Sequence, residues 1–302
     1  MKANGLNSRA LKPLAFALSA LGLAALSGPP VQAADDISPT AEAFSDMPAC
    51  QSLREQYPDL GDTLKVGLGG YTKGWEAPTA DDPSQLEGLD PSLFDRIGSC
   101  LGMTPSYQNG SFNVLLTSIA SGRVDIGPML YVTDERKEQV SFVASIQVRD
   151  SSIVKQGNPE ALTSMDDLCG KTVASAAGTY EAATLIPQQS QACTAAGKPA
   201  VSLLLVQNTD NSIQAVRSGR ADIYLTEAGS ARQISAQDPT LDTAFSIDLP
   251  IMVGYPLAKD NTTLINAVHD ALAVIQSTGA EKRLLERWGQ GADGERPVAI
   301  FD

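Results

Sequence analysis

The sequence predicts an α/β protein built from two similar lobes. The hexapeptide SGRVDI occupies residues 121–126, and the nearly identical SGRADI occupies residues 218–223. Each copy follows a segment with helical apolar spacing, contains a glycine that can end a helix, and leads into a short apolar strand. Helix, glycine and buried strand form the repeating step of a parallel sheet covered by helices. Two such distant steps indicate two α/β lobes rather than one large sheet, and 302 residues with 43% hydrophobic content are enough for one or two domains.

The remaining elements are predicted from apolar periodicity and turn-forming residues, in chain order. Helices are expected at 49–57, 89–103, 111–120 and 211–217. Strands are expected at 64–68, 124–130 and 221–226, and a loop rich in turn-forming residues is expected at 71–88. The helix at 89–103 has an apolar face made of Leu89, Leu93, Phe94, Ile97 and Leu101. Pro91 lies near the start of this helix, where proline is tolerated.

Residues 1–33 have the character of a secretory signal peptide. Basic residues precede a short apolar run, and small residues stand at the −3 and −1 positions of a cleavage site after Ala33. A transmembrane anchor is the alternative, but the apolar run is too short for a comfortable span. We therefore expect export to the periplasm. Cleavage would move the formal net charge from −13 to about −16, which argues against nucleic acid or anionic membrane as partners.

The exported chain would keep four cysteines: Cys50, Cys100, Cys169 and Cys193. An even number of cysteines in an exported protein predicts disulfides, and four cysteines allow three pairings. We favour Cys50–Cys100 and Cys169–Cys193, because these pairs fall in separate halves of the chain. A zinc site is the alternative, but the sequence has no CxxC pair and His269 is its only histidine. No metal and no cofactor are therefore expected.

Two oppositely charged residues follow the strands of the repeated units. Arg136 lies in YVTDERKEQVSF after the first strand, and Glu227 lies in TEAGSA after the second. Ligands of open α/β sheets bind beyond the carboxyl ends of the strands, so the lobes could hold a zwitterion between them. Each residue also has a simpler interpretation. Arg136 could pair with Asp134 or Glu135 on a solvated helix end, and Glu227 could stabilise a helix N-terminus.

These motifs resemble the family 3 extracellular solute-binding proteins, the periplasmic receptors of polar amino acid ABC importers. TDERKEQVSF is similar to the TxERxxxVxF signature of that family, and further similar blocks in the same order extend over roughly residues 63–289. The resemblance implies a type II periplasmic-binding-protein fold, with two α/β lobes joined by two crossing strands. It implies the following division: an N-terminal extension at 34–62, a discontinuous lobe 1 at 63–147 and 252–290, lobe 2 at 148–251, and a C-terminal tail at 291–302.

The resemblance also implies roles for charged and backbone groups. Arg136 matches the family arginine that grips the ligand α-carboxylate, for which a bidentate guanidinium is suited. Glu227 matches the position, usually Asp, that receives the α-ammonium group. Gly178 and Thr179 match a strand-to-helix turn whose backbone N–H groups cap the same carboxylate.

Aromatic residues complete the ligand site that the resemblance implies. Tyr71 and Trp75 fall near the family's aromatic contact to the ligand side chain. Tyr131 stands where the family usually has a small hydroxyl or glycine, so it would narrow the pocket. Some binders of basic amino acids have an acid where this chain has Gly69 and Gly70, so we expect a ligand that is not strongly basic.

The resemblance implies a monomeric binding protein, not an enzyme, that captures an amino acid or a similar molecule and delivers it to a membrane ABC permease. Two alternatives remain open. One is a periplasmic dehydratase-type enzyme on the same fold, with Glu227 as general acid. The other is a ligand sensor without transport, which would need the same closing cleft. Hydrolytic motifs such as GxSxG, HExxH and the P-loop are absent from the sequence.

Overall fold

The computed structural model describes residues 40–302, apart from the side chains of Leu249 and Pro250. The predicted signal peptide and its cleavage site lie outside the described residues. Within residues 40–302, no helix combines the length and apolar character needed to cross a lipid bilayer.

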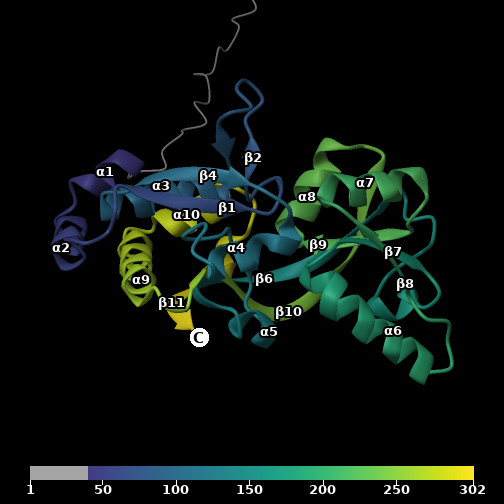
Figure 1. Cartoon of the computed structure of the whole chain (residues 1–302). Coiled ribbons are helices and arrows are strands. Elements are labelled where there is room, and N and C mark those ends of the chain that lie inside the picture. Colours follow the sequence, from purple (N-terminus) through teal and green to yellow (C-terminus); the bar gives the residue numbers. More distant parts are fainter. Residues whose placement is uncertain (1–39) are drawn as a thin grey trace, which may run out of the picture. The chain divides into compact units, whose positions relative to one another are not determined.

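Two long antiparallel strands run through both lobes of the fold (Figure 1). They are β6 (Val140–Lys155) and β10 (Leu241–Ala258). The strand order along this sheet is β5-β10-β6-β9-β7-β8, and β11 also pairs with β6. The pairing of β10 with β6 changes register between Ile247 and Ile251, where the strands pass from one lobe to the other. This arrangement confirms the predicted α/β fold with two lobes joined by two crossing strands.

Lobe 1 contains elements from both ends of the chain. Its first part consists of α1 (Ala41–Ser45), α2 (Pro48–Gln56), β1 (Thr63–Leu68), β2 (Ala77–Pro78), β3 (Leu86–Glu87), α3 (Leu89–Leu101), β4 (Thr104–Asn109), η1 (Phe112–Val114), α4 (Leu115–Ala120), β5 (Leu130–Tyr131) and α5 (Asp134–Lys137). Its second part consists of α9 (Thr262–Ser277), α10 (Ala280–Arg287), η4 (Ala292–Gly294) and β11 (Glu295–Phe301). The residues expected as a C-terminal tail thus contain a strand, which pairs with the lobe 1 part of β6.

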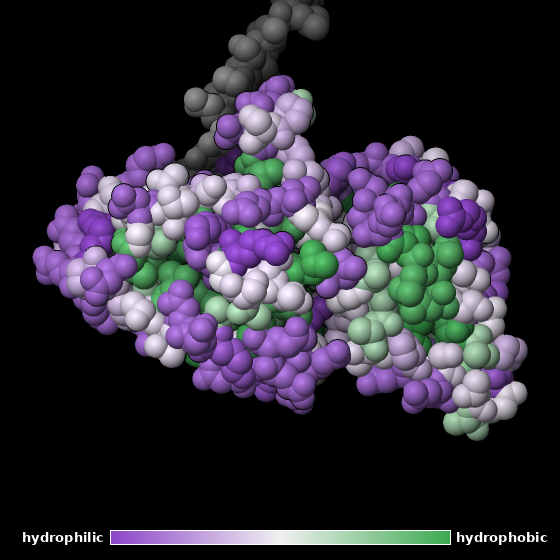
Figure 2. Space-filling model, viewed as in Figure 1, coloured by the Kyte–Doolittle hydropathy of each residue, from purple (hydrophilic) through white to green (hydrophobic). Residues whose placement is uncertain are grey.

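Lobe 2 is the segment between the crossing strands. It consists of η2 (Met165–Leu168), β7 (Thr172–Ala176), the π-helical turn η3 (Glu181–Leu185), α6 (Ile186–Ala195), β8 (Ser202–Val206), α7 (Thr209–Ser218), β9 (Ile223–Glu227) and α8 (Ala228–Gln237). Ile223 and Leu225 pack into one hydrophobic cluster and Tyr224 packs into another, so β9 is buried on both faces. At the sheet edge, apolar side chains gather over β7 and β8 (Figure 2), and Leu205 is 58% exposed.

The repeated hexapeptide has the predicted structure in its second copy and a different one in its first. Gly219 ends α7 in the left-handed conformation, with φ of 73°, and β9 follows as expected. Gly122 also has a positive φ, but the strand predicted at 124–130 is wrong. Ile126 forms only isolated bridges there, and the regular strand β5 is limited to two residues. Pro128 explains the interruption, because proline lacks the N–H that a continuous strand needs.

Both predicted disulfides are confirmed. Cys50–Cys100 joins α2 to the end of α3, and Cys169–Cys193 joins the loop after η2 to α6. The predicted apolar face of α3 is also confirmed, because its five apolar residues are buried in the lobe 1 core. The first disulfide therefore ties the helices before β1 to that core.

Candidate functional site

A cavity of about 140 Å³ lies between side chains of the two lobes. This volume is below the ~300–1,000 Å³ typical of pockets for drug-sized molecules, so it suits a smaller molecule. Lobe 1 contributes the loop after β1 and the segment around β5. Lobe 2 contributes residues beyond the carboxyl ends of β7, β8 and β9, where ligands of such sheets bind. Six of the predicted site residues line the cavity: Tyr71, Trp75, Tyr131, Arg136, Thr179 and Glu227.

Arg136 is buried at the cavity wall, with 7% of its surface exposed. Its Nη1 donates to the Tyr131 carbonyl at 2.9 Å, and its Nη2 donates to the Gly178 carbonyl at 3.1 Å. Burial lowers the pKa of Arg136, while the neighbouring Glu181 carboxylate opposes this shift. Asp134 pairs with Lys137 at 2.9 Å instead. The alternative of Arg136 on a solvated helix end therefore does not hold.

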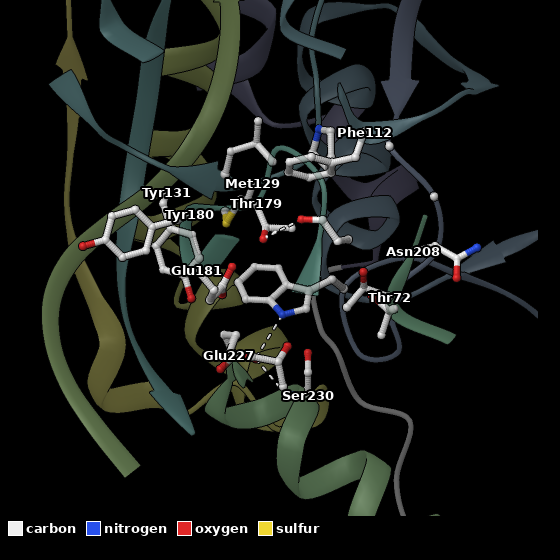
Figure 3. A pocket seen from close by; sticks show the side chains of 18 of the residues that line it. Thr72, Phe112, Met129, Tyr131, Thr179, Tyr180, Glu181, Asn208, Glu227 and Ser230 are labelled. Carbon is white, nitrogen blue, oxygen red and sulfur yellow. Dashed lines mark hydrogen bonds between the residues drawn. The ribbon is translucent and has the colours of Figure 1, made fainter. Parts of the chain in front are cut away.

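Glu227 is both the N-cap of α8 and a residue of the cavity wall. Its carboxylate accepts the backbone N–H groups of Gly229 at 2.6 Å and Ser230 at 2.8 Å. It also accepts the indole N–H of Trp75 from lobe 1 at 3.1 Å (Figure 3). With its amide nitrogen facing the carboxylate, Gln290 donates to Oε1 at 3.1 Å and Oε2 at 2.8 Å. Glu227 thus caps the N-terminus of α8, as the simpler interpretation expected, and it also contacts lobe 1 through Trp75.

The pKa of Glu227 reflects two opposing effects. Burial raises the pKa of this carboxyl above its ordinary value, because a charge is costly to remove from water. The bonds from Gly229, Ser230 and Trp75 lower it, because they stabilise the charged form. A carboxylate with this many donors is well suited to hold the lobes together.

The turn that contains Gly178 and Thr179 differs in detail from its expected role. The N–H of Thr179 donates to the Ala176 carbonyl at 3.3 Å, so this donor is used within the turn. Gly178 is not one of the residues that line this cavity and instead borders a neighbouring pocket that Arg136 also lines. Its φ of 87° is in the region that favours glycine, and its carbonyl accepts the bond from Arg136. The turn therefore contacts Arg136 through the carbonyl oxygen of Gly178, whereas the expected role used its backbone N–H groups.

Aromatic side chains form much of the remaining wall (Figure 3). The rings of Tyr131 and Tyr180 lie 5.3 Å apart, centre to centre. Trp75 is 7% exposed, whereas Tyr71 is 40% exposed at the edge of the cavity. The guanidinium of Arg136 lies 5.9 Å from the centre of the Phe112 ring. Tyr131 contributes its ring to the cavity, and its hydroxyl donates to Asp150.

The sequence reasoning missed the acidic residues Glu181 and Asp150, and also Glu76, which lines the cavity from lobe 1. Glu181 lines the cavity directly, beside Tyr180 (Figure 3), and burial raises its pKa. Asp150 is fully buried on β6, opposite Glu227 on β9, and burial together with Glu181 raises its pKa well above the ordinary value. Glu181 could have been suspected, since it follows the Gly178–Thr179 turn by two residues. The sequence around Asp150 does not indicate a site residue, because only the course of the crossing strand β6 brings Asp150 to the site.

A buried carboxyl pair supports the lobe 1 wall. Asp90 accepts the backbone N–H of Met129 at 3.1 Å, and Met129 lines the cavity. Burial, followed by the effect of Asp90, raises the pKa of Glu76 well above its usual value. Two carboxyls this close and this buried cannot both carry a charge at low cost, so the pair is stable when it holds a proton.

Comparison with known families gives one match over most of the chain. The model of the bacterial extracellular solute-binding proteins, family 3, matches residues 64–291. Among characterised relatives, the L-cystine-binding protein TcyJ of Escherichia coli (strain K12) is 27% identical over 258 residues. That similarity covers 84% of this chain and 90% of TcyJ.

Solved structures with the same fold support this match. An ancestral arginine-binding protein bound to arginine has a TM-score of 0.66 and 24% identity, over 76% of this chain and 98% of that chain. The amino acid ABC transporter substrate-binding protein AbpA from Streptococcus pneumoniae, bound to L-arginine, has a TM-score of 0.68 and 22% identity. That alignment covers 82% of this chain and all of AbpA. These identities show a shared fold, which is the type II periplasmic-binding-protein fold.

Proposed function

Because the chain belongs to the bacterial extracellular solute-binding proteins, family 3, we propose that it captures an amino acid or a close derivative for import. The ligand would occupy the cavity between the lobes. The protein would act as a periplasmic monomer, processed after Ala33, and would deliver the ligand to a membrane ABC permease.

The observation that carries this proposal is the placement of opposite charges in one cavity. Arg136 reaches the wall from lobe 1, and the carboxylates of Glu227 and Glu181 reach it from lobe 2. The bonds of Arg136 to two carbonyls use two of the five N–H groups of a guanidinium, so others can hold a carboxylate. A ligand with both a carboxylate and an ammonium group satisfies both sides, and exclusion of water strengthens each contact.

Contacts between the lobes support a closing mechanism. Besides the Trp75–Glu227 bond, Lys73 donates to Gln237 at 2.5 Å and Gln233 donates to the Trp288 carbonyl at 2.5 Å. In the proposed mechanism, these bonds form only when the lobes approach, and the crossing strands bend to allow it. The irregular pairing of β10 near Ile247 makes this segment the proposed hinge.

The family match disfavours the dehydratase alternative, since the relatives are binding proteins. Burial raises the pKa of Glu227, as a general acid would need, but the carboxyl is already bonded to the N–H groups of Gly229, Ser230 and Trp75. These contacts fit a residue that holds the lobes and a ligand better than one that transfers a proton. Transport and sensing share the same closing cleft, and growth on the ligand after deletion of the protein would distinguish them.

Calorimetry with a panel of free amino acids tests the proposal. Arg136→Ala should weaken binding of the amino acid that wild type prefers by roughly 30-fold or more, because the buried partner of the ligand carboxylate is lost. Arg123→Ala is a matched control, since Arg123 is exposed and is not one of the residues that line the cavity. If Arg136→Ala and Arg123→Ala bind equally well, the proposed carboxylate site is refuted.

A further inference from the structure

We infer that Glu181 selects a ligand with a cationic side chain, so that the cavity prefers a positively charged amino acid over a neutral one of the same shape. This inference rests on the proposed function and deepens it. It replaces the sequence-based expectation of a ligand that is not strongly basic.

The first observation is an imbalance of charge around the cavity. Arg136 can be matched by the ligand α-carboxylate, and Glu227 or Glu181 can be matched by the α-ammonium group. One carboxylate then remains without a partner in the cavity. Glu76 also lines the cavity, and its pair with Asp90 keeps one negative charge when the two carboxyls share a proton, which adds to the imbalance. A second positive charge on the ligand would reduce the imbalance.

The second observation separates the roles of the two glutamates. Glu227 is surrounded by protein donors from Gly229, Ser230 and Trp75. Glu181 has no ion-pair partner within 4.0 Å among residues 40–302, although the charge of Arg136 acts on it. The Glu181 residue is 6% exposed and lines the cavity. The Thr179 side chain and the Glu181 backbone N–H also contact this carboxyl, but no donor from the described part of lobe 1 does, whereas Glu227 is bonded across the lobes to Trp75. Glu181 is therefore the cavity carboxylate that a ligand cation can reach without breaking a bond between the lobes.

Asp150 and the aromatic wall add to the preference for a cation. Among residues 40–302, the buried Oδ2 atom of Asp150 has no hydrogen-bond partner, while Tyr131 donates to its other oxygen. The negative charge of Glu181 raises the pKa of Asp150, because two nearby carboxylates repel each other. A ligand cation between them would offset this repulsion. Tyr180 and Trp75 also line the cavity, and aromatic faces attract cations.

The experiment compares ligands that differ in charge and little in shape. Wild-type protein is titrated calorimetrically with L-arginine and L-citrulline, and separately with L-lysine and Nε-acetyl-L-lysine. We expect the cationic member of at least one pair to bind roughly 30-fold more tightly, and Glu181→Gln to reduce that ratio to about threefold or less. Glu138→Gln, which removes an exposed carboxylate nearby, should leave the ratio unchanged.

A second measurement does not depend on any variant. Binding of a cation should release protons from Glu181, which lines the cavity, and from Asp150 next to it, because burial raises the pKa of both carboxyls. The same cavity is lined by Glu76 and Glu227, whose pKa burial also raises, by Arg136, which stays charged, and by Tyr131, Tyr180 and Tyr224, which stay neutral. Affinity for the cationic ligand should therefore rise with pH, and calorimetry in buffers of different ionisation heat should detect the protons released.

The outcomes separate the inference from the function on which it rests. If wild type binds both members of each pair equally well, or if Glu181→Gln keeps the full preference, the inference is overturned and the proposed function stands. If neutral and cationic amino acids all fail to bind while the protein is folded, the proposed function fails and the inference fails with it.

Discussion

Replacing Trp75 with phenylalanine tests how the two lobes are held together. The substitution keeps most of the aromatic ring but removes the indole N–H, which donates to Glu227 of the other lobe at 3.1 Å. Trp75 is 7% exposed, so water replaces this bond poorly. Hydrogen bonds to charged groups contribute about 1.5–3 kcal/mol, and the other donors to Glu227 keep the cost near the middle of this range.

Loss of the Trp75–Glu227 bond should weaken ligand binding by destabilising the closed state of the lobes. If the bond forms only when the lobes are closed, its loss destabilises that state by about 2 kcal/mol. Apparent affinity falls in proportion to the closed fraction, so Trp75→Phe should bind the ligand about 30-fold more weakly. Isothermal titration of the ligand identified for wild type measures this change directly.

Trp288→Phe is the matched control for this experiment. Its indole N–H donates to the Ser92 hydroxyl at 3.2 Å, and both residues belong to lobe 1. Losing that bond affects the open and closed states equally, and the Trp288 carbonyl that accepts from Gln233 of lobe 2 is kept. The dissociation constant should therefore change by no more than about threefold. If Trp75→Phe binds as tightly as Trp288→Phe, the contact between Trp75 and Glu227 does not contribute to closure.

Two further predictions concern closure and stability. Gly229→Ala should block closure, because its new Cβ would lie 2.7 Å from the Gly289 carbonyl of lobe 1. X-ray scattering should show less compaction with ligand than for Gly110→Ala, whose Cβ would have no contact closer than 3.8 Å. Burial raises the pKa of Glu281 to about 7 from an ordinary value of 4.5, so its native state binds the proton more tightly than its unfolded state. The stability that Glu281 contributes should therefore fall as pH rises from about 4.5 to about 7, and urea unfolding of Glu281→Gln should lack this component of the pH dependence.

The repeated hexapeptide predicted the two lobes well because the features that it indicates depend only on neighbouring residues. A helical apolar face, a glycine able to take positive φ and a short apolar strand are each encoded within a few residues. The same reasoning failed at 124–130, where Pro128 interrupts the pairing that the apolar pattern suggested. The disulfides were also predictable, because separate halves of the chain became separate lobes.

The site was only partly predictable from sequence. Arg136 and Glu227 follow strands of the repeated units, so their approach to one cavity could be inferred from topology. Asp150 lies on a crossing strand, and its place beside Tyr131 depends on β10 pairing with both β5 and β6. The bond from Trp75 to Glu227 joins residues 152 positions apart in the sequence, so only the packed lobes reveal it.

Mass spectrometry of the small molecule released from gently purified protein tests the central claim most directly. The claim is that Arg136 and the cavity carboxylates hold a carboxylate and an ammonium group of one ligand. We predict that wild type releases a compound with both an α-amino and an α-carboxylate group, and that Arg136→Ala releases far less of it. Release of a dicarboxylate or a sugar acid without an amino group would contradict the claim, as would equal amounts from both proteins.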